Sequence, residues 1–206
     1  MLHYETISPS TLELLKSLQS IAFLQDTCLV GGTALALQLG HRKSIDLDIF
    51  GSITASSSEI RQTLSAKHSV QVLKESANID IYIVDGVKVD FVNYSYGLIQ
   101  PVIVQDNLRL ASIEDIAAMK IAAIIGRGTK KDFIDLFFLL RRYSLKELLG
   151  FYSAKYPDGT LFIALKSLTY FEDAESDPMP EMLEHMNWAQ IKESVSLSVR
   201  SYLSAY

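Results

Sequence analysis

The sequence of 206 residues predicts an α+β fold, with a mixed β-sheet and helices in residues 1–110 and a helical bundle in residues 111–206. Three observations support this prediction. Short apolar runs bounded by turn residues dominate the first segment. Capping residues followed by longer apolar patterns of helical period fill the second. The chain is 49% hydrophobic and 21% charged, so it can bury a core and is not a disordered chain.

The elements of the first segment follow from local signals. Ser8-Pro9 or Ser10 caps the first helix, and Gly40 ends the second. Asp85-Gly86 is a two-residue hairpin signal. The expected elements are a helix to Ile21, a strand at 28–30, a helix at 33–39, an aspartate-bearing strand at 45–49, a helix from Ser56, Ser57 or Ser58 to about Ala66, and strands at 70–73, 79–84, 87–92, 102–104 and 108–110.

The second segment has helical signals throughout. Ser112 and Asp115 resemble a capping box and start a helix through Ile125, which 126–128 interrupts. Thr129 caps the next helix, which is expected to run to about Arg142. Further helices are expected at 145–156, 161–170 and 188–202.

The most informative stretch runs from Val30 to Phe50. It opens with Gly31-Gly32-Thr33, and a glycine turn that enters a helix offers bare backbone N–H groups to phosphate. It closes with Asp46 and Asp48, which alternate with apolar neighbours and therefore project from one face of a strand. Two such carboxylates repel each other, and Mg²⁺, which prefers oxygen ligands, would relieve that repulsion. This combination is typical of a protein that moves a phosphoryl or nucleotidyl group.

The glycine–hydroxyl block, a gap of twelve residues and the Asp46-Leu47-Asp48 block together resemble the signature of the polymerase β-like nucleotidyltransferase superfamily. The resemblance implies a nucleotidyltransferase-like mixed sheet, with Gly32 and Thr33 on the triphosphate and the aspartate pair on a metal. The alternative interpretation is a helix–strand unit whose aspartates are solvated on an edge strand.

The superfamily pattern also implies a third carboxylate from a later strand. Asp90 lies between Val89 and Phe91 in the second strand of the expected hairpin. A charged residue between apolar neighbours in such a strand suggests a functional role. Asp80 occupies a similar position in the partner strand. The local pattern favours Asp90, either as a metal ligand or as the group that activates the incoming hydroxyl.

A second block runs from Lys120 to Asp135. Residues 120–146 contain seven Lys or Arg and two Asp, in a chain of net charge -5. Helices with surface salt bridges would explain most of these residues, but they explain Lys120 less well, because its neighbours are apolar. Lys120, then Arg127, then a Lys-Asp-x-x-Asp-Leu run that contains Asp132 and Asp135 resembles the helical motif of the AbiEii toxin family.

The AbiEii resemblance extends to the tail, through 170–175, Pro178, Pro180 and Trp188. It implies a nucleotidyltransferase-fold toxin of a bacterial toxin–antitoxin, phage-defence system, with a cognate antitoxin as partner. Carried onto this chain, the implied nucleotide-binding residues are Gly31, Gly32, Thr33, Lys120 and Arg127. The implied metal ligands are Asp46 and Asp48, and Asp90 joins them from the superfamily pattern rather than from the AbiEii motif. The catalytic set is completed by Lys120, Asp132 and Asp135. Whether Asp132 and Asp135 orient the cations or act directly is left open.

The expected function is Mg²⁺-dependent transfer of a nucleoside monophosphate from a nucleoside triphosphate to an acceptor, with RNA or tRNA as a candidate acceptor. The basic strip in 120–146 permits backbone contacts to RNA, but the sequence shows no base-stacking aromatic array. The alternatives are a non-catalytic nucleotide- or partner-binding module, a nucleotidyltransferase that acts on a small molecule such as an antibiotic, and phosphoryl transfer to protein.

The remaining features bear on location and partners. The single cysteine, Cys28, permits no internal disulfide, and no apolar run is long enough to span a bilayer, so a cytoplasmic protein is expected. His41, Arg42 and Lys43 are placed to meet a triphosphate or a nucleic-acid backbone, or form a solvated turn. The acidic stretch 172–184 either docks on the basic helices, meets an antitoxin or is a solvated loop.

Overall fold

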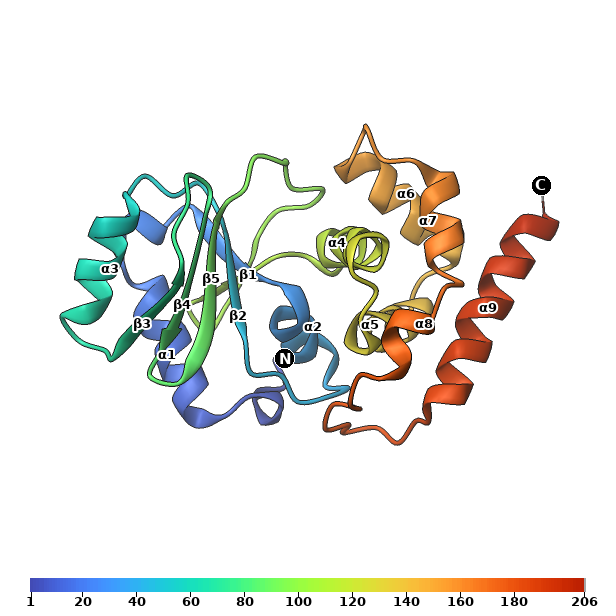
Figure 1. The fold of residues 1–206 in the computed structure, drawn as a ribbon, viewed down its shortest axis with the longest axis horizontal. Coiled ribbons are helices and arrows are strands. Elements are labelled where there is room, and N and C mark those ends of the chain that lie inside the picture. The colour runs from blue at the N-terminus through green and yellow to red at the C-terminus, as the bar shows by residue number, and fades with distance from the viewer. Residues whose placement is uncertain (206) are drawn as a thin grey trace.

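The computed structural model describes residues 1–205, and in this part of the chain a seven-stranded mixed sheet has the strand order β3-β4-β5-β2-β1-β7-β6 (Figure 1). Pairs β2–β5 and β1–β7 are parallel, and the other neighbours are antiparallel. The sheet therefore has β2 at its centre, between β5 and β1. The strands are β1 (Thr27–Val30), β2 (Leu47–Gly51), β3 (Val70–Lys74), β4 (Ile79–Val84), β5 (Val87–Asn93), β6 (Ile103–Gln105) and β7 (Leu108–Leu110).

Four helices begin directly after a serine that caps their N-terminus. Ser8, Ser56, Ser112 and Ser144 each accept a hydrogen bond from a backbone N–H of the first turn. Among residues 1–205, no helix has the length and apolar character needed to cross a membrane. The helices are α1 (Pro9–Gln19), α2 (Gly31–Leu39), α3 (Ser57–Ser65), α4 (Ile113–Gly126), α5 (Lys130–Leu140), α6 (Leu145–Lys155), α7 (Leu161–Ser167), α8 (Glu172–Glu175) and α9 (Trp188–Ser204), with short 3-10 helices at Tyr4–Thr6 and Ala22–Leu24.

Two boundaries next to the glycine and aspartate blocks differ from the expectation. Helix α2 begins at Gly31 rather than at Thr33, so both glycines belong to its first turn. Strand β2 begins at Leu47 rather than at residue 45, because its first residue paired with a neighbouring strand is Leu47, opposite Val89 of β5. Asp46 therefore lies just before the strand and not within it.

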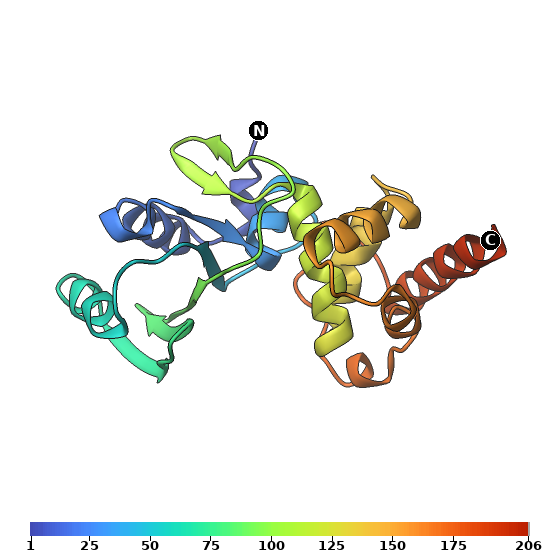
Figure 2. The same ribbon diagram turned by 90° about the horizontal axis from the view of Figure 1, so that it is seen from above.

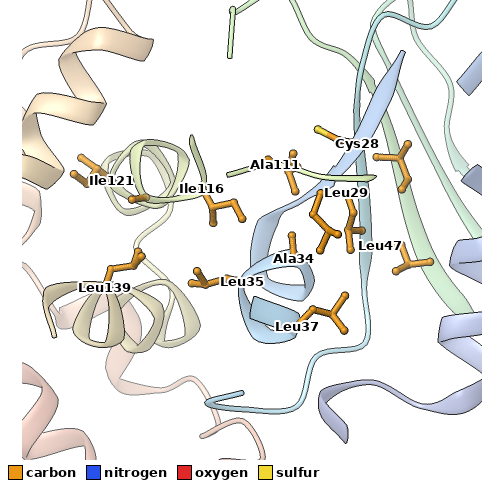
Figure 3. Packing of buried hydrophobic residues seen from close by; sticks show 14 of the residues in the cluster. Cys28, Leu29, Ala34, Leu35, Leu37, Leu47, Ala111, Ile116, Ile121 and Leu139 are labelled. Atoms are coloured by element: carbon orange, nitrogen blue, oxygen red, sulfur yellow. The ribbon is translucent and has the colours of Figure 1, made fainter. Parts of the chain in front are cut away.

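Helix α2 is the layer between the sheet and the helices of the C-terminal half. Figure 3 shows Ala34 and Leu37 on the side of Leu29 and Leu47, and Leu35 directed toward Ile116 and Leu139. All seven side chains are buried. One cluster of buried apolar residues runs from Leu2 to Val199, so strands and C-terminal helices share a core. The proposed division into domains at residue 110 coincides with the end of β7 and stays a prediction.

The C-terminal helices gather on one side of the sheet, as the view from above shows (Figure 2). The acidic stretch 172–184 follows them and docks on the same molecule. Asp177 accepts a hydrogen bond from the backbone N–H of Lys130 at 2.9 Å, and Glu184 pairs with Arg141. Of the three interpretations of this stretch, the structure therefore supports docking on the basic helices.

A buried ion pair ties the loop after β5 to α6. Asp115, at the start of α4, lies 2.7 Å from the ammonium group of Lys155, and both side chains are fully buried. Asp115 also accepts backbone hydrogen bonds from Ile99 and Gln100, and Lys155 donates to the carbonyl of Gly97 at 3.0 Å. The pair therefore holds the loop against the helices.

We expect Lys155→Met to lower the free energy of unfolding by about 3 kcal/mol or more, because the Asp115 carboxylate would stay buried without its cation. Urea denaturation measures this change. Lys166→Met is the matched control, since Lys166 is exposed on α7. Equal stability of the two variants would contradict the structural role of the pair.

Candidate active site

Two aspartates lie side by side at the centre of the sheet. Asp48 of β2 and Asp90 of β5 are directly paired in a parallel register, so their side chains share one face. Asp80 of β4 pairs with Phe91 and therefore points to the opposite face. There its carboxylate accepts hydrogen bonds from Ser57 and from the backbone of Ser76. The geometry favours Asp90 over Asp80 as the third acid.

The glycine pair makes room for two charged side chains. Gly31 has a left-handed backbone, with φ of 68°, and a Cβ on it would lie 2.0 Å from Oδ2 of Asp48. A Cβ on Gly32 would lie 2.3 Å from Nη2 of Arg42. The first turn of α2 therefore approaches Asp48 with its bare backbone, and the N–H groups of that turn have no partner within the helix.

Asp48 carries an uncompensated negative charge. Burial, and then the neighbouring Asp90, raise the pKa of Asp48 to about 6, against the opposing effect of Lys120 and Lys88. Asp90 lies 2.6 Å from the ammonium group of Lys88. Asp48 is therefore the carboxylate at which an added cation would relieve most repulsion.

The carboxylates present fit a divalent cation that is completed by a substrate. Among residues 1–205, no three His, Cys, Asp or Glu side chains are grouped closely enough to hold a metal by themselves. The carboxylate of Asp46, which is 37% exposed, lies 3.9 Å from the ammonium group of Lys131. However, Asp46, Asp48 and Asp90 line one polar cavity. Mg²⁺ commonly takes one or two protein carboxylates together with substrate phosphates, so this donor set suits it.

The second sequence block forms a buried ionic network beside these carboxylates. The ammonium group of Lys120 lies 3.0 Å from Asp132 and 2.7 Å from Asp135. Arg127 donates to both oxygens of Asp132, at 3.0 and 3.2 Å, and Thr129 donates to the same carboxylate at 2.7 Å. The geometry therefore favours the orienting role of Asp132 and Asp135 over direct action.

The charges in this network are stable in the neutral pH range. Burial alone lowers the pKa of Lys120, but Asp135 and Asp132 outweigh it, so the pKa rises. Burial alone raises the pKa of Asp132, but Lys120 and Arg127 outweigh it and lower the pKa to about 2. The pKa of Asp135 also lies well below its usual value, because Arg42 and Lys120 outweigh burial.

His41 and Arg42 belong to the network, which the sequence did not reveal. Arg42 donates to both oxygens of Asp135, at 2.7 and 2.9 Å, and Nε2 of His41 lies 2.8 Å from the same carboxylate. Both side chains are buried. For His41 and Arg42, the alternative of a solvated turn is therefore wrong. Arg42 lines the polar cavity together with Gly32 and Asp48, and a contact with a triphosphate there stays a prediction. The sequence signal that could have revealed this network is Asp135, which lies in the apolar run 133–140, because a buried carboxylate needs a cation.

Thr33 holds the aspartate loop. Its side chain is buried, and its hydroxyl donates to the backbone carbonyl of Asp46 and lies 2.8 Å from the hydroxyl of Ser44. Its proton is thereby used within the protein. The role of the Thr33 hydroxyl at a triphosphate stays a prediction, and its observed contacts position Asp46.

Two adjoining cavities meet at the paired aspartates. A polar cavity of about 150 Å³ is lined by most of the charged groups described above, but not by His41 or Asp135. A more apolar cavity of about 360 Å³ shares four residues with it, namely Asp48, Asp90, Lys120 and Arg127, and adds Phe50, Tyr94, Met119 and Tyr156. A larger hollow of about 850 Å³, between α6 and α9, contains none of the predicted site residues. All predicted site residues except Asp135 thus line one or both of the two smaller cavities.

Replacing Asp48 with Asn tests the repulsion between the aspartates. The folded-state pKa of about 6 is above the unfolded value, so ionised Asp48 destabilises the folded protein, with a cost that grows between about pH 4 and 6 and is constant above. We expect Asp48→Asn to raise the free energy of unfolding of the metal-free protein by about 1–3 kcal/mol at neutral pH and by less in acid.

Urea denaturation at both pH values measures the effect of Asp48→Asn. The exposed Asp173 of α8 gives the control variant Asp173→Asn, which should change stability little at either pH. A loss of stability in Asp48→Asn at neutral pH would contradict the repulsion.

Comparison with known proteins places this geometry in a family. The chain is 36% identical over 197 residues to the uncharacterized protein aq_aa25 of Aquifex aeolicus (strain VF5), with 93% of this chain and 95% of that protein covered. The fold is similar to that of JHP933 from Helicobacter pylori, with a TM-score of 0.60, 21% identity and coverage of 95% and 92% of the two chains. It is also similar to MenT4, nucleotidyltransferase toxin Rv2826c from Mycobacterium tuberculosis H37Rv, with a TM-score of 0.55, 17% identity and coverage of 90% and 82%.

The family comparison agrees with the sequence resemblance. A family model described as "Nucleotidyl transferase AbiEii toxin, Type IV TA system" matches residues 13–202. The predicted fold class and family are confirmed. The chain belongs to the AbiEii family of nucleotidyltransferase toxins.

Proposed function

We propose that this protein transfers a nucleoside monophosphate from a nucleoside triphosphate to an acceptor hydroxyl, with Mg²⁺ as the metal. The strongest support for this proposal is the position of the paired aspartates. The Asp48–Asp90 pair lies against the bare first turn of α2 and shares two cavities with the cations Lys120 and Arg127.

The triphosphate would lie in the polar cavity. The N–H groups at the start of α2, contributed by Gly31, Gly32 and Thr33, face this anion at the positive end of the helix. The side chain of Arg127 is 64% exposed, and its guanidinium has N–H groups beyond those that contact Asp132. The ammonium group of Lys120 pairs with Asp132 and Asp135, which leaves one of its three N–H groups for a ligand, and Lys120 lines both cavities. These groups would stabilise the leaving pyrophosphate.

The proposed metal ligands are Asp48 and Asp90, with Asp46 in the same cavity. Bound there with the triphosphate, Mg²⁺ would supply positive charge to the reacting phosphate oxygens. Asp90 is the proposed third acid, as a ligand or as the acceptor of the hydroxyl proton. Asp132 and Asp135 are proposed to act through Lys120, Arg127 and Arg42 rather than on the substrate.

The acceptor and the partners are further parts of the proposal. RNA, including tRNA, is the proposed acceptor, supported by the exposed cations Arg127 and Lys131 at the polar cavity. Membership of a toxin–antitoxin family supports a cognate antitoxin as partner. We propose the cytoplasm as the site of action, since nucleoside triphosphates and tRNA are found there.

A labelling assay tests the transfer. The protein is incubated with Mg²⁺, total bacterial RNA and each nucleoside triphosphate, labelled at either the α- or the γ-phosphate. We expect α-label in RNA and release of pyrophosphate. Asp48→Asn should lower the rate at least 100-fold, because the charge that faces the metal is lost. Asp173→Asn should leave the rate unchanged.

The other outcomes identify the alternatives. Transfer of γ-label to protein without pyrophosphate would indicate phosphoryl transfer. Pyrophosphate release with α-label on a small molecule only would indicate an antibiotic-type acceptor. If the protein, free of antitoxin and supplied with all candidate acceptors, binds nucleotide but transfers nothing, that result would contradict catalysis and favour a binding module.

A further inference from the structure

The chain assembles an aromatic cluster that the sequence did not indicate. Phe50 of β2, Tyr94 after β5, Tyr96 in the following loop and Tyr156 at the end of α6 come from three separate parts of the chain. The ring centroids lie 5.2 Å apart for Phe50–Tyr94, 5.4 Å for Tyr94–Tyr96 and 4.9 Å for Tyr96–Tyr156. We refer to these four residues as the aromatic wall.

The aromatic wall is continuous with the paired aspartates. Phe50 lies two residues after Asp48 in the same strand, so both side chains are on one face of the sheet. The cavity of about 360 Å³ contains Phe50, Tyr94 and Tyr156 together with Asp48 and Asp90. A molecule in this cavity would therefore touch the rings at one end and the charged groups at the other.

The wall also faces a second hollow. Phe50, Tyr94 and Met119 separate the cavity of about 360 Å³ from a neighbouring one of about 350 Å³, which Tyr96 and Leu98 also line. Tyr96 is 46% exposed and Leu98 is 45% exposed. Apolar surface thus continues outward from the aspartates toward solvent.

Two of the three hydroxyl groups of the wall bond within the protein. The hydroxyls of Tyr94 and Tyr156 form one hydrogen bond, in which either can be the donor, with 2.6 Å between their oxygens. The ammonium group of Lys155 lies 5.3 Å from the centroid of the Tyr94 ring and donates to Gly97 and Asp115. Tyr94 and Tyr156 are therefore held in place by protein contacts, and the face of the Tyr94 ring away from Lys155 is the one that a ligand could cover.

We propose that the aromatic wall stacks a nucleobase at the reacting end of a substrate. This inference rests on the proposed function, because aromatic rings next to the cavity proposed for the triphosphate match the chemistry of a nucleotide, which carries a base beside its phosphates. A base stacked on an aromatic side chain gains about 1–3 kcal/mol. The base belongs either to the incoming nucleoside triphosphate or to the end of the acceptor strand, and the two sources give different results below.

Tyr94→Leu tests the wall, because leucine keeps apolar volume and removes the ring. Three quantities are measured: the affinity for inorganic tripolyphosphate in Mg²⁺, the affinity for a nucleoside triphosphate in Mg²⁺, and the KM for RNA. Tripolyphosphate contains no base, so its affinity should be unchanged. If the base is that of the donor, the nucleotide affinity falls about 5- to 100-fold. If the base is that of the acceptor, the KM for RNA rises by a similar factor.

Two control variants and one replacement variant accompany Tyr94→Leu. Tyr170→Leu removes an exposed tyrosine ring outside both cavities and should change none of the three quantities. Tyr94→Phe keeps the ring and should retain most of the affinity. Tyr156→Leu repeats the test from α6 if Tyr94→Leu does not fold.

One result would overturn the inference, and it is distinguishable from failure of the proposed function. Unchanged nucleotide affinity and unchanged KM in folded Tyr94→Leu and Tyr156→Leu would refute the wall, while transfer by the wild type stands. Absence of both tripolyphosphate and nucleotide binding in the wild type would instead refute the proposed function on which the wall depends.

Discussion

The carboxylate of Asp135 is the interaction on which the site depends. It is completely buried, and a buried charge is tolerated only when cations and hydrogen bonds surround it. Arg42 and His41 come to it from the loop before β2, and Lys120 comes from α4. Asp135 thus joins the glycine–aspartate segment to the C-terminal helices. The requirement for Arg42 in turn explains Gly32, because any Cβ at that position would meet the guanidinium.

The same residue type has opposite electrostatic roles in this site. Asp132 and Asp135 are surrounded by cations, their pKa values are lowered, and they keep Lys120 and Arg127 charged and in place. Asp48 faces another carboxylate, and its pKa is raised. The first pair is satisfied within the protein, whereas Asp48 gains most from a cation that arrives with the substrate. This difference follows from which neighbours the fold provides.

The sequence predicted the features that depend on local pattern. Periodicity and caps gave the order of helices and strands, and alternation with apolar neighbours singled out Asp48 and Asp90. Features that depend on distant contacts were missed. Arg42 and Asp135 are 93 residues apart, and the aromatic wall combines β2, the loop after β5 and α6. The side-chain hydroxyl of Thr33 bonds to the carbonyl of Asp46, a contact that residue spacing does not specify.

A double-mutant cycle on Arg42→Met and Asp135→Asn tests the central claim most directly. The free energy of unfolding is measured by urea denaturation for the wild type, both single variants and the double variant. If the bidentate pair joins the two segments, each single variant leaves a buried charge without its partner, and the coupling energy is about 2 kcal/mol or more. Effects that add to within about 0.5 kcal/mol would show that the two residues are energetically independent and would contradict the account.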